Sequence, residues 1–209
     1  MTDEQTLRLE EVFKVSGVPT HTFVEPAEFD SLKVALRTPG RGVVVEGPSG
    51  IGKSTGVVRA LQALGLADRV TQLSARRIDD VEYIGDLPSL GDFGVVIIED
   101  FHVLPDDLRT RVADFLKTLA DAEAENQKVV VVGINRAGDT LVRHAPDLNN
   151  RIDTIRFEVE PRVKIAELVA KGQAAMNVRL RLPRTSLRGQ RGASTQHRCS
   201  VTSCAWRPE

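Results

Sequence analysis

A glycine-rich run in the first third of the chain contains the residue types that bind phosphate groups. It comprises Gly47, Pro48, Ser49, Gly50, Ile51, Gly52, Lys53, Ser54 and Thr55. The spacing G-x-x-x-x-G-K-[ST] is the Walker A motif, and the β-branched segment Val43–Val45 leads directly into it. The two motif glycines let backbone N–H groups surround an anion, and the following helix adds the positive end of its dipole. Lys53 would neutralise β- and γ-phosphate charge, and the Ser54 hydroxyl would coordinate Mg²⁺. The alternative interpretation is a glycine-rich turn that merely precedes a helix.

Two adjacent acids end a strongly apolar segment further along. Val95–Ile98 shows no alternation and is followed by Glu99 and Asp100, which is typical of a central parallel strand covered on both faces. A Walker B strand needs one carboxylate to hold Mg²⁺ and an adjacent one to polarise the attacking water. By position we assign Glu99 to the metal and Asp100 to the water. The alternative is a buried strand whose acids only cap the next turn.

Segments of strand and helix character alternate along the chain. Strands are expected over Gly42–Glu46, Arg69–Leu73, Val95–Asp100, Lys128–Ile134 and Asp153–Val159, and helices over Glu4–Val15, Ala27–Arg37, Ser54–Leu64, Pro105–Leu119, Gly138–His144 and Pro161–Lys171. This alternation predicts an α/β fold with an open parallel sheet and its ligand at the strand carboxyl ends. Together with the Walker A motif, the expected architecture is a three-layer P-loop NTPase. The pairs Arg76-Arg77 and Asp79-Asp80 are interpreted as the solvated start of a helix and not as a binding patch.

Composition fits one α/β domain with attachments, because 41% of the 209 residues are hydrophobic and 27% are charged. The formal net charge of −1 argues against a whole-molecule nucleic-acid or membrane binder. Residues 1–5 are polar, and no apolar run reaches the length of a membrane span, so a cytoplasmic location is expected. The two cysteines, Cys199 and Cys204, are interpreted as unpaired thiols of the C-terminal tail.

The order of these motifs resembles the AAA+ and STAND branch of P-loop ATPases, over residues 18–171. In that family a polar residue after the strand that follows Walker B, called sensor 1, orients the attacking water; Asn135 lies at this position. An arginine before the last strand reaches a neighbouring subunit as an arginine finger, and Arg151 is the candidate, with Arg143 in reserve. Val18–Val24 matches the position of the segment that flanks the adenine.

The residues in and around both Walker motifs are similar to those of ATPase modules of bacterial multidomain signalling or defence proteins. The resemblance implies ATP and Mg²⁺ as cofactors and hydrolysis to ADP and phosphate, with Asp100 and Asn135 positioning the water. It also implies self-association, or a parent multidomain protein, as the source of the arginine finger.

The sequence departs from the family pattern in two places. The family's Walker B motif usually ends Asp-Glu, and the shorter Asp100 at the second position predicts slow hydrolysis, which suits a nucleotide-dependent switch or assembly module. The helical lid is expected to be incomplete, because a basic tail without acids follows it. The expected organisation is N-terminal helices and adenine-flanking segment over 1–40, ATPase core over 41–160, start of the lid over 161–182 and disordered tail over 183–209. For that tail, a solvated segment is favoured over a nucleic-acid-binding arm.

Two other function classes remain open at this point. One is a nucleotide-binding scaffold that does not hydrolyse its ligand, and the other is a small P-loop kinase with an acceptor pocket and an arginine-rich lid. Asn135 and Arg151 favour the ATPase over the kinase. The chain contains no N-K-x-D motif, which favours ATP over GTP.

Overall fold

The computed structural model describes residues 7–14, 17–134, 137–138, 141, 146–159 and 161–178, with only the backbone of Pro146. Within these residues, five strands form one sheet in the order β2-β3-β4-β1-β5, and every pairing is parallel. The strands are β1 (Gly42–Glu46), β2 (Val70–Ser74), β3 (Gly94–Glu99), β4 (Gln127–Gly133) and β5 (Ile152–Arg156).

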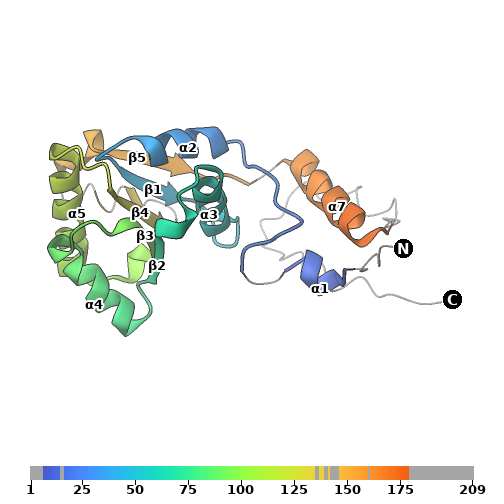
Figure 1. Ribbon diagram of the computed structural model, residues 1–209, viewed down its shortest axis with the longest axis horizontal. Coiled ribbons are helices and arrows are strands. Elements are labelled where there is room, and N and C mark those ends of the chain that lie inside the picture. Colours follow the sequence, from blue (N-terminus) through green and yellow to red (C-terminus); the bar gives the residue numbers. More distant parts are fainter. Residues whose placement is uncertain are drawn as a thin grey trace, which may run out of the picture. The chain divides into compact units, whose positions relative to one another are not determined.

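Helices cover both faces of this sheet (Figure 1). The helices of this layered core are α2 (Phe29–Arg37), α3 (Lys53–Ala63), α4 (Ile78–Asp86) and α5 (Asp106–Asp121). Side chains of α2 and α3 pack on one face, and side chains of α4 and α5 pack on the other. The three-layer α/β prediction is therefore confirmed, and the expected strands and core helices form with boundaries shifted by a few residues at most.

The central positions of β1, β3 and β4 are apolar without alternation because both faces of these strands are buried. In β1, Val43 and Val45 contact the cluster formed with α2 and α3, whereas Val44 contacts the cluster formed with α4 and α5. Successive residues of β3 and β4 likewise contact opposite clusters: Val96 and Ile98 of β3 contact the cluster formed with α4 and α5, whereas Val95 and Ile97 contact the one formed with α2 and α3. This two-sided burial explains the lack of polar alternation in the sequence.

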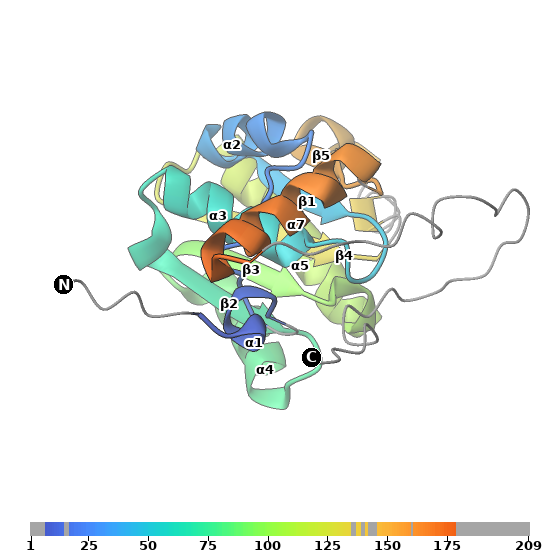
Figure 2. The ribbon, with the colours of Figure 1, turned by 90° about the vertical axis from the view of Figure 1, so that its right-hand side faces the viewer.

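The parallel strands place all their carboxyl ends along one edge of the sheet. The arrowheads of β1 and β5 point to the right in Figure 1, so Figure 2 looks onto this edge. The glycine-rich loop joins the end of β1 to α3, and Glu99 and Asp100 stand at the end of β3. The topology thus brings the glycine-rich loop and the two acids to the same edge of the sheet, as expected for an open α/β sheet.

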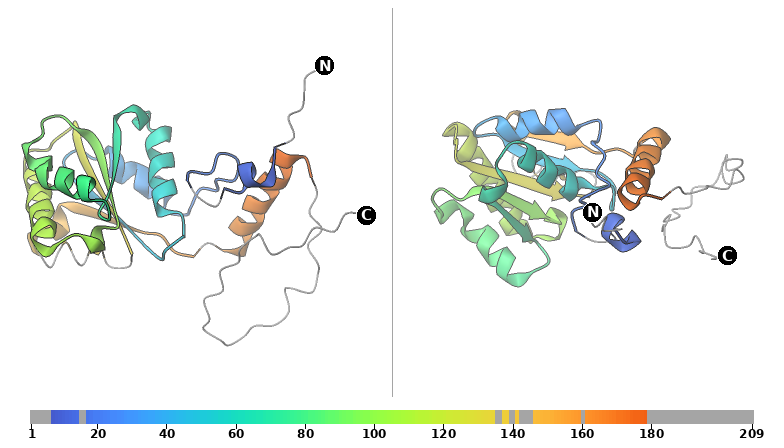
Figure 3. Two further views of the ribbon diagram at one scale, coloured as in Figure 1. Left: turned by 90° about the horizontal axis from the view of Figure 1, so that it is seen from below. Right: turned by 45° about the vertical axis from the view of Figure 1, so that its right-hand side comes forward.

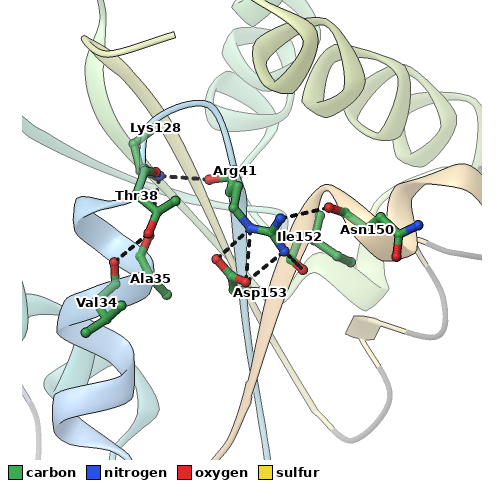
Figure 4. A network of polar contacts seen from close by, with 8 residues as sticks. All are labelled: Val34, Ala35, Thr38, Arg41, Lys128, Asn150, Ile152 and Asp153. Atoms are coloured by element: carbon green, nitrogen blue, oxygen red, sulfur yellow. Dashed lines mark hydrogen bonds and ion pairs between the residues drawn. The ribbon is translucent and has the colours of Figure 1, made fainter. Parts of the chain in front are cut away.

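The opposite edge, at the amino ends of the strands, is fixed by a buried lysine and an ion pair (Figure 4). Lys128 of β4 is 7% exposed, and its Nζ donates to the main-chain oxygen of Thr38, after α2, and to that of Arg41 at 2.8 Å. The Arg41 guanidinium pairs with Asp153 of β5 at 2.9 Å and donates to the Asn150 oxygen at 2.8 Å. These contacts hold the end of α2 and the starts of β1, β4 and β5 together.

Two further helices, α1 (Leu9–Val12) and α7 (Arg162–Met176), lie side by side in the views of Figures 1 and 3. Phe13 packs so closely on Gly172 of α7 that a larger residue at this position would have to displace the phenyl ring. The N-terminal helix is shorter than expected because the chain turns at Phe13, while α7 continues beyond Lys171 until Asn177 adopts a left-handed conformation. Of the expected helix Gly138–His144, only Gly138 and Leu141 lie within the described residues.

No helix among the described residues combines the length and the apolar character that crossing a lipid bilayer requires.

Candidate functional site

The loop between β1 and α3 has a backbone that only glycine can follow. Gly47, Gly50 and Gly52 have φ angles of 149°, 77° and 97°. A Cβ on Gly47 would collide with the main-chain oxygen of Phe157. Gly52 is the N-cap of α3, whose first turn has N–H groups without intrahelical partners. The sequence-predicted phosphate loop therefore has a conformation that presents a helix N-terminus, which favours anions.

The Lys53 side chain folds back over this loop. Its ammonium donates to the main-chain oxygens of Gly47 at 2.9 Å and Pro48 at 2.8 Å, and the residue is 9% exposed. Burial lowers the pKa of Lys53, and the nearby Glu99 and Asp100 carboxylates oppose this by favouring the charged form. An anion in the loop would favour the charged form in the same way.

Two oxygen ligands suited to a hard divalent cation meet beside Lys53. Ser54 and Glu99 line the same cavity. Burial raises the pKa of Glu99, and the contact with Ser54 lowers it in part. Hydroxyl and carboxylate oxygens are the protein ligands that Mg²⁺ accepts, with water and phosphate completing its shell. These two residues fit the metal-binding role that we assign to them.

Asp100 is held by an arginine that sequence reasoning did not assign to the site. The backbone of Asp100 is left-handed, with φ 55°, and Arg76 Nε donates to its Oδ2 at 2.6 Å. The Asp100 carboxylate raises the pKa of Arg76 further above its ordinary value. We expected Arg76 to be a solvated residue at a helix start, and its side chain is indeed largely exposed. Its pairing with Asp100 arises because β2 is the neighbour of β3 in the sheet, so the residues after their two ends meet.

A cavity of about 360 Å³ joins these groups. It is lined by Ser49, Gly50, Gly52, Lys53, Ser54, Thr55, Arg76, Glu99, Asp100, Val132, Gly133 and Ile134. Most residues of the predicted phosphate loop and both predicted Walker B acids therefore line one cavity, bordered by the end of β4. Asn135 follows Ile134 directly but lies outside the described residues, as does Arg143.

A second cavity, of about 460 Å³, shares Ser54, Thr55 and Glu99 with the first. Gly17 and Val18 line it from the N-terminal segment, together with residues of β2 and the start of α4. The segment Val18–Val24, expected beside an adenine, thus begins next to the phosphate loop. The Arg59 guanidinium of α3 holds this segment by donating to the main-chain oxygen of Pro19.

Arg151 lies away from these cavities, at the amino end of β5. Its guanidinium donates to Asp121 Oδ1 at 2.9 Å and to the main-chain oxygen of Asp147 at 3.1 Å. It lines a separate cavity of about 340 Å³ with Arg41, Asn150 and residues around the end of α5. The structure does not bring Arg151 to the phosphate loop of its own chain.

Comparison with known proteins identifies the fold. No protein-family model matches the chain, and no curated protein matches its sequence. Among solved structures, domain III of the Thermotoga maritima replication initiation protein DnaA matches with TM-score 0.52 and 16% identity, over 76% of this chain and 73% of that one. A mutant of Thermotoga maritima RuvB matches with TM-score 0.52 and 19% identity, over 75% of this chain and 53% of that one.

The Aeropyrum pernix ORC1 protein, solved in complex with DNA, matches with TM-score 0.51 and 13% identity, over 72% of this chain and 50% of that one. The matched parts are thus about half of the RuvB and ORC1 chains and about three quarters of the DnaA domain. These similarities show that the chain has the AAA+ P-loop ATPase fold. Fold similarity at this level of identity leaves the activity to be argued from the site itself.

Proposed function

We propose that this protein binds Mg-ATP and hydrolyses it slowly to ADP and phosphate, and that it acts as a nucleotide-dependent switch or assembly module. One observation carries the proposal: the Lys53 ammonium, the Ser54 hydroxyl and the Glu99 carboxylate line a single cavity above the glycine loop. A cation for phosphate, two oxygen ligands for Mg²⁺ and a helix N-terminus form a constellation that serves phosphate binding.

Each group has a distinct part in binding. The amides of the loop and Lys53 hold the phosphates, and Lys53 exchanges its bonds to the Gly47 and Pro48 oxygens for bonds to phosphate oxygens. Ser54 and Glu99 would hold Mg²⁺, which when bound neutralises charge on the β- and γ-phosphates. Phosphoryl transfer depends almost entirely on such positioning and charge stabilisation.

Asp100 and Asn135 are proposed to position the attacking water. In this structure Arg76 forms an ion pair with the Asp100 carboxylate, so this pair must break before Asp100 can accept a proton from water. An aspartate also reaches less far than the glutamate usual at this position. Both features support slow turnover, which lets the nucleotide state persist long enough to act as a signal.

Binding without turnover is the second candidate function. The observation that favours it is again the pairing of Arg76 with Asp100 at 2.6 Å, which removes the proposed water-polarising group. A protein of this kind would use nucleotide only to order the loop and the elements around it.

Self-association, or attachment to a longer parent protein, is proposed to supply the arginine finger in trans. Arg151 is the proposed residue, and its position at the amino end of β5, away from its own phosphate loop, is compatible with a role at a neighbouring subunit. To act there, it must exchange Asp121 and Asp147 for the neighbour's phosphate.

Measuring Mg-ATP affinity and phosphate release on the same sample tests the proposal. Binding with slow release of phosphate supports the ATPase. Binding without phosphate release over many hours selects the scaffold. Transfer of the phosphoryl group to an added small-molecule acceptor points to a kinase, and a parent protein that binds no nucleotide refutes the proposal.

A further inference from the structure

A buried carboxylate stands immediately before the phosphate loop. Glu46 is the last residue of β1, and it is 2% exposed. Its Oε1 accepts from Nε and Nη2 of Arg156, at the end of β5, at 2.9 and 2.7 Å. Its Oε2 accepts from the Gly138 N–H at 3.4 Å, in the segment after β4. One side chain therefore joins three parts of the chain at the carboxyl edge of the sheet.

The residue that follows β5, Phe157, supports the loop from a second side. Phe157 donates its N–H to the main-chain oxygen of Glu46 at 2.8 Å and is almost fully buried. Its main-chain oxygen lies against Gly47, and its ring lies against Gly56 of α3, where a Cβ would be 2.8 Å from ring carbons. The start of the phosphate loop and the first turns of α3 therefore both rest on the chain that leaves β5.

The ion pair is unequal in its exposure to water. The Glu46 side chain is buried, whereas the Arg156 side chain is 65% exposed. Arg156 can return to water if the pair breaks, but the carboxylate cannot without moving the end of β1. An ionised carboxylate left buried without a cation is strongly disfavoured, so the Glu46 side chain would shift toward solvent. A shift of Glu46 moves Gly47 with it.

We propose that Glu46 and Arg156 are positioning residues that fix the phosphate loop in its binding conformation by fastening the residue before it to β5 and to the segment after β4. The inference rests on the proposed function, since it concerns how the same loop is held. It also connects the start of the loop to Gly138, in the segment after β4. Neither residue touches phosphate, and both act through the backbone at Gly47.

The test compares two arginines on the same pair of strands. Arg156→Met removes the cation at the carboxyl ends of β1 and β5, and Arg41→Met removes the one that pairs with Asp153 at their amino ends. Each substitution breaks an ion pair between an arginine and an acid, and only Arg156 lies beside the loop. The double variant Glu46→Gln/Arg156→Met removes both charges of the first pair, so that no unpaired carboxylate is left buried beside the loop.

Two measurements are made on nucleotide-free and Mg-ATP-bound protein, at a temperature where circular dichroism shows every variant folded. The first is the dissociation constant for Mg-ATP, and the second is hydrogen exchange of the amides of residues 49–55. Arg156→Met should raise the dissociation constant about 10- to 100-fold, as loss of a supporting partner does at ligand sites, and should speed exchange in the loop. Arg41→Met should change neither quantity, and the double variant should return both toward the parent values.

The proposal is overturned if Arg156→Met and Arg41→Met affect affinity and loop exchange alike, or if the double variant shows no recovery. If Arg156→Met does not fold, Arg156→Lys replaces it, with Arg41→Lys as its control. Lysine keeps the charge but cannot reproduce the two-nitrogen contact, so a smaller loss of the same kind is expected. If the parent does not bind Mg-ATP, the proposed function fails, and loop exchange in the nucleotide-free variants still decides the role of the pair.

Discussion

Replacement of Lys53 by methionine should separate nucleotide affinity from stability. Methionine keeps the length of the apolar stem and removes the ammonium that donates to the Gly47 and Pro48 oxygens. Those two oxygens lie in a loop beside an open cavity, so water can replace the lost donor. Because burial disfavours the charged form of Lys53 and lowers its pKa, the uncharged residue should leave the free energy of unfolding within about 1 kcal/mol of the parent value.

The expected loss of affinity follows from the contacts that Lys53 exchanges. An ammonium about 4 Å from a phosphate charge gains about 4 kcal/mol at an effective dielectric constant of about 20. Each of the two carbonyl hydrogen bonds that it gives up offsets about 1 kcal/mol of this. The net contribution is about 2 kcal/mol, so Lys53→Met should raise the dissociation constant for Mg-ATP about 30-fold.

Lys128→Met is the matched control, since Lys128 is also buried and also donates to main-chain oxygens. Its acceptors are packed at the end of α2, so their loss of a donor should lower the free energy of unfolding by about 1–3 kcal/mol. Its distance from the loop, at the opposite edge of the sheet, should leave affinity unchanged. Isothermal titration calorimetry gives the affinities, and urea unfolding gives the stabilities.

The opposite pattern would refute this reasoning. If Lys53→Met binds Mg-ATP as tightly as the parent, the loop is not a phosphate site. If the affinity of Lys53→Met falls only in proportion to a loss of folded protein, Lys53 stabilises the fold and does not bind phosphate. A loss of affinity in Lys128→Met, at equal folded fraction, would show that the comparison measures general packing and not phosphate contact.

Four further outcomes are expected. Asp100→Asn should keep Mg-ATP bound but stop phosphate release, whereas Glu99→Gln should weaken the Mg²⁺-dependent part of binding; the reverse result in calorimetry with and without Mg²⁺ would exchange their roles. Arg76→Ala should free Asp100 and raise the rate of phosphate release, and an unchanged or lower rate would show that the pair does not restrain turnover. Arg151→Ala should leave affinity unchanged but abolish any rise of hydrolysis per subunit with protein concentration; no such rise in the parent would remove the finger role. Burial lowers the pKa of Lys128 from 10.5 to about 8, so the unfolded chain binds more protons than the folded chain between these two pH values. The free energy of unfolding, relative to that of Lys128→Met, should therefore increase by up to about 3 kcal/mol as pH rises from about 8 toward about 10.5. A difference in unfolding free energy that is constant or falls with pH would contradict this.

Local sequence patterns determined the fold and the phosphate loop. The β1 valines, the glycine spacing and Lys53 lie within thirteen consecutive residues from Val43 to Thr55, and their conformational preferences act over that distance. Non-alternating apolar runs marked the strands buried on both faces, and the parallel sheet of the AAA+ fold followed from their alternation with helices. Burial of a strand on both faces favours apolar residues at successive positions, and this pattern is visible in the sequence.

Side-chain partners between distant segments were decided only by the tertiary structure. Arg76 and Asp100 are 24 residues apart, and nothing near Arg76 in the sequence distinguishes it from Arg77, which pairs with Asp80 instead. Glu46 and Arg156, 110 residues apart, meet because β1 and β5 are neighbours in register.

The same holds for Arg151, whose neighbours at the amino edge of the sheet come from the end of α5 and from the turn before β5. Periodicity and motif spacing predict which face of an element is buried and which loop is suited to bind an anion. An ion pair depends on strand order and register, and these are properties of the assembled sheet, because they are set by the packing of the whole core and not by the residues that form the pair.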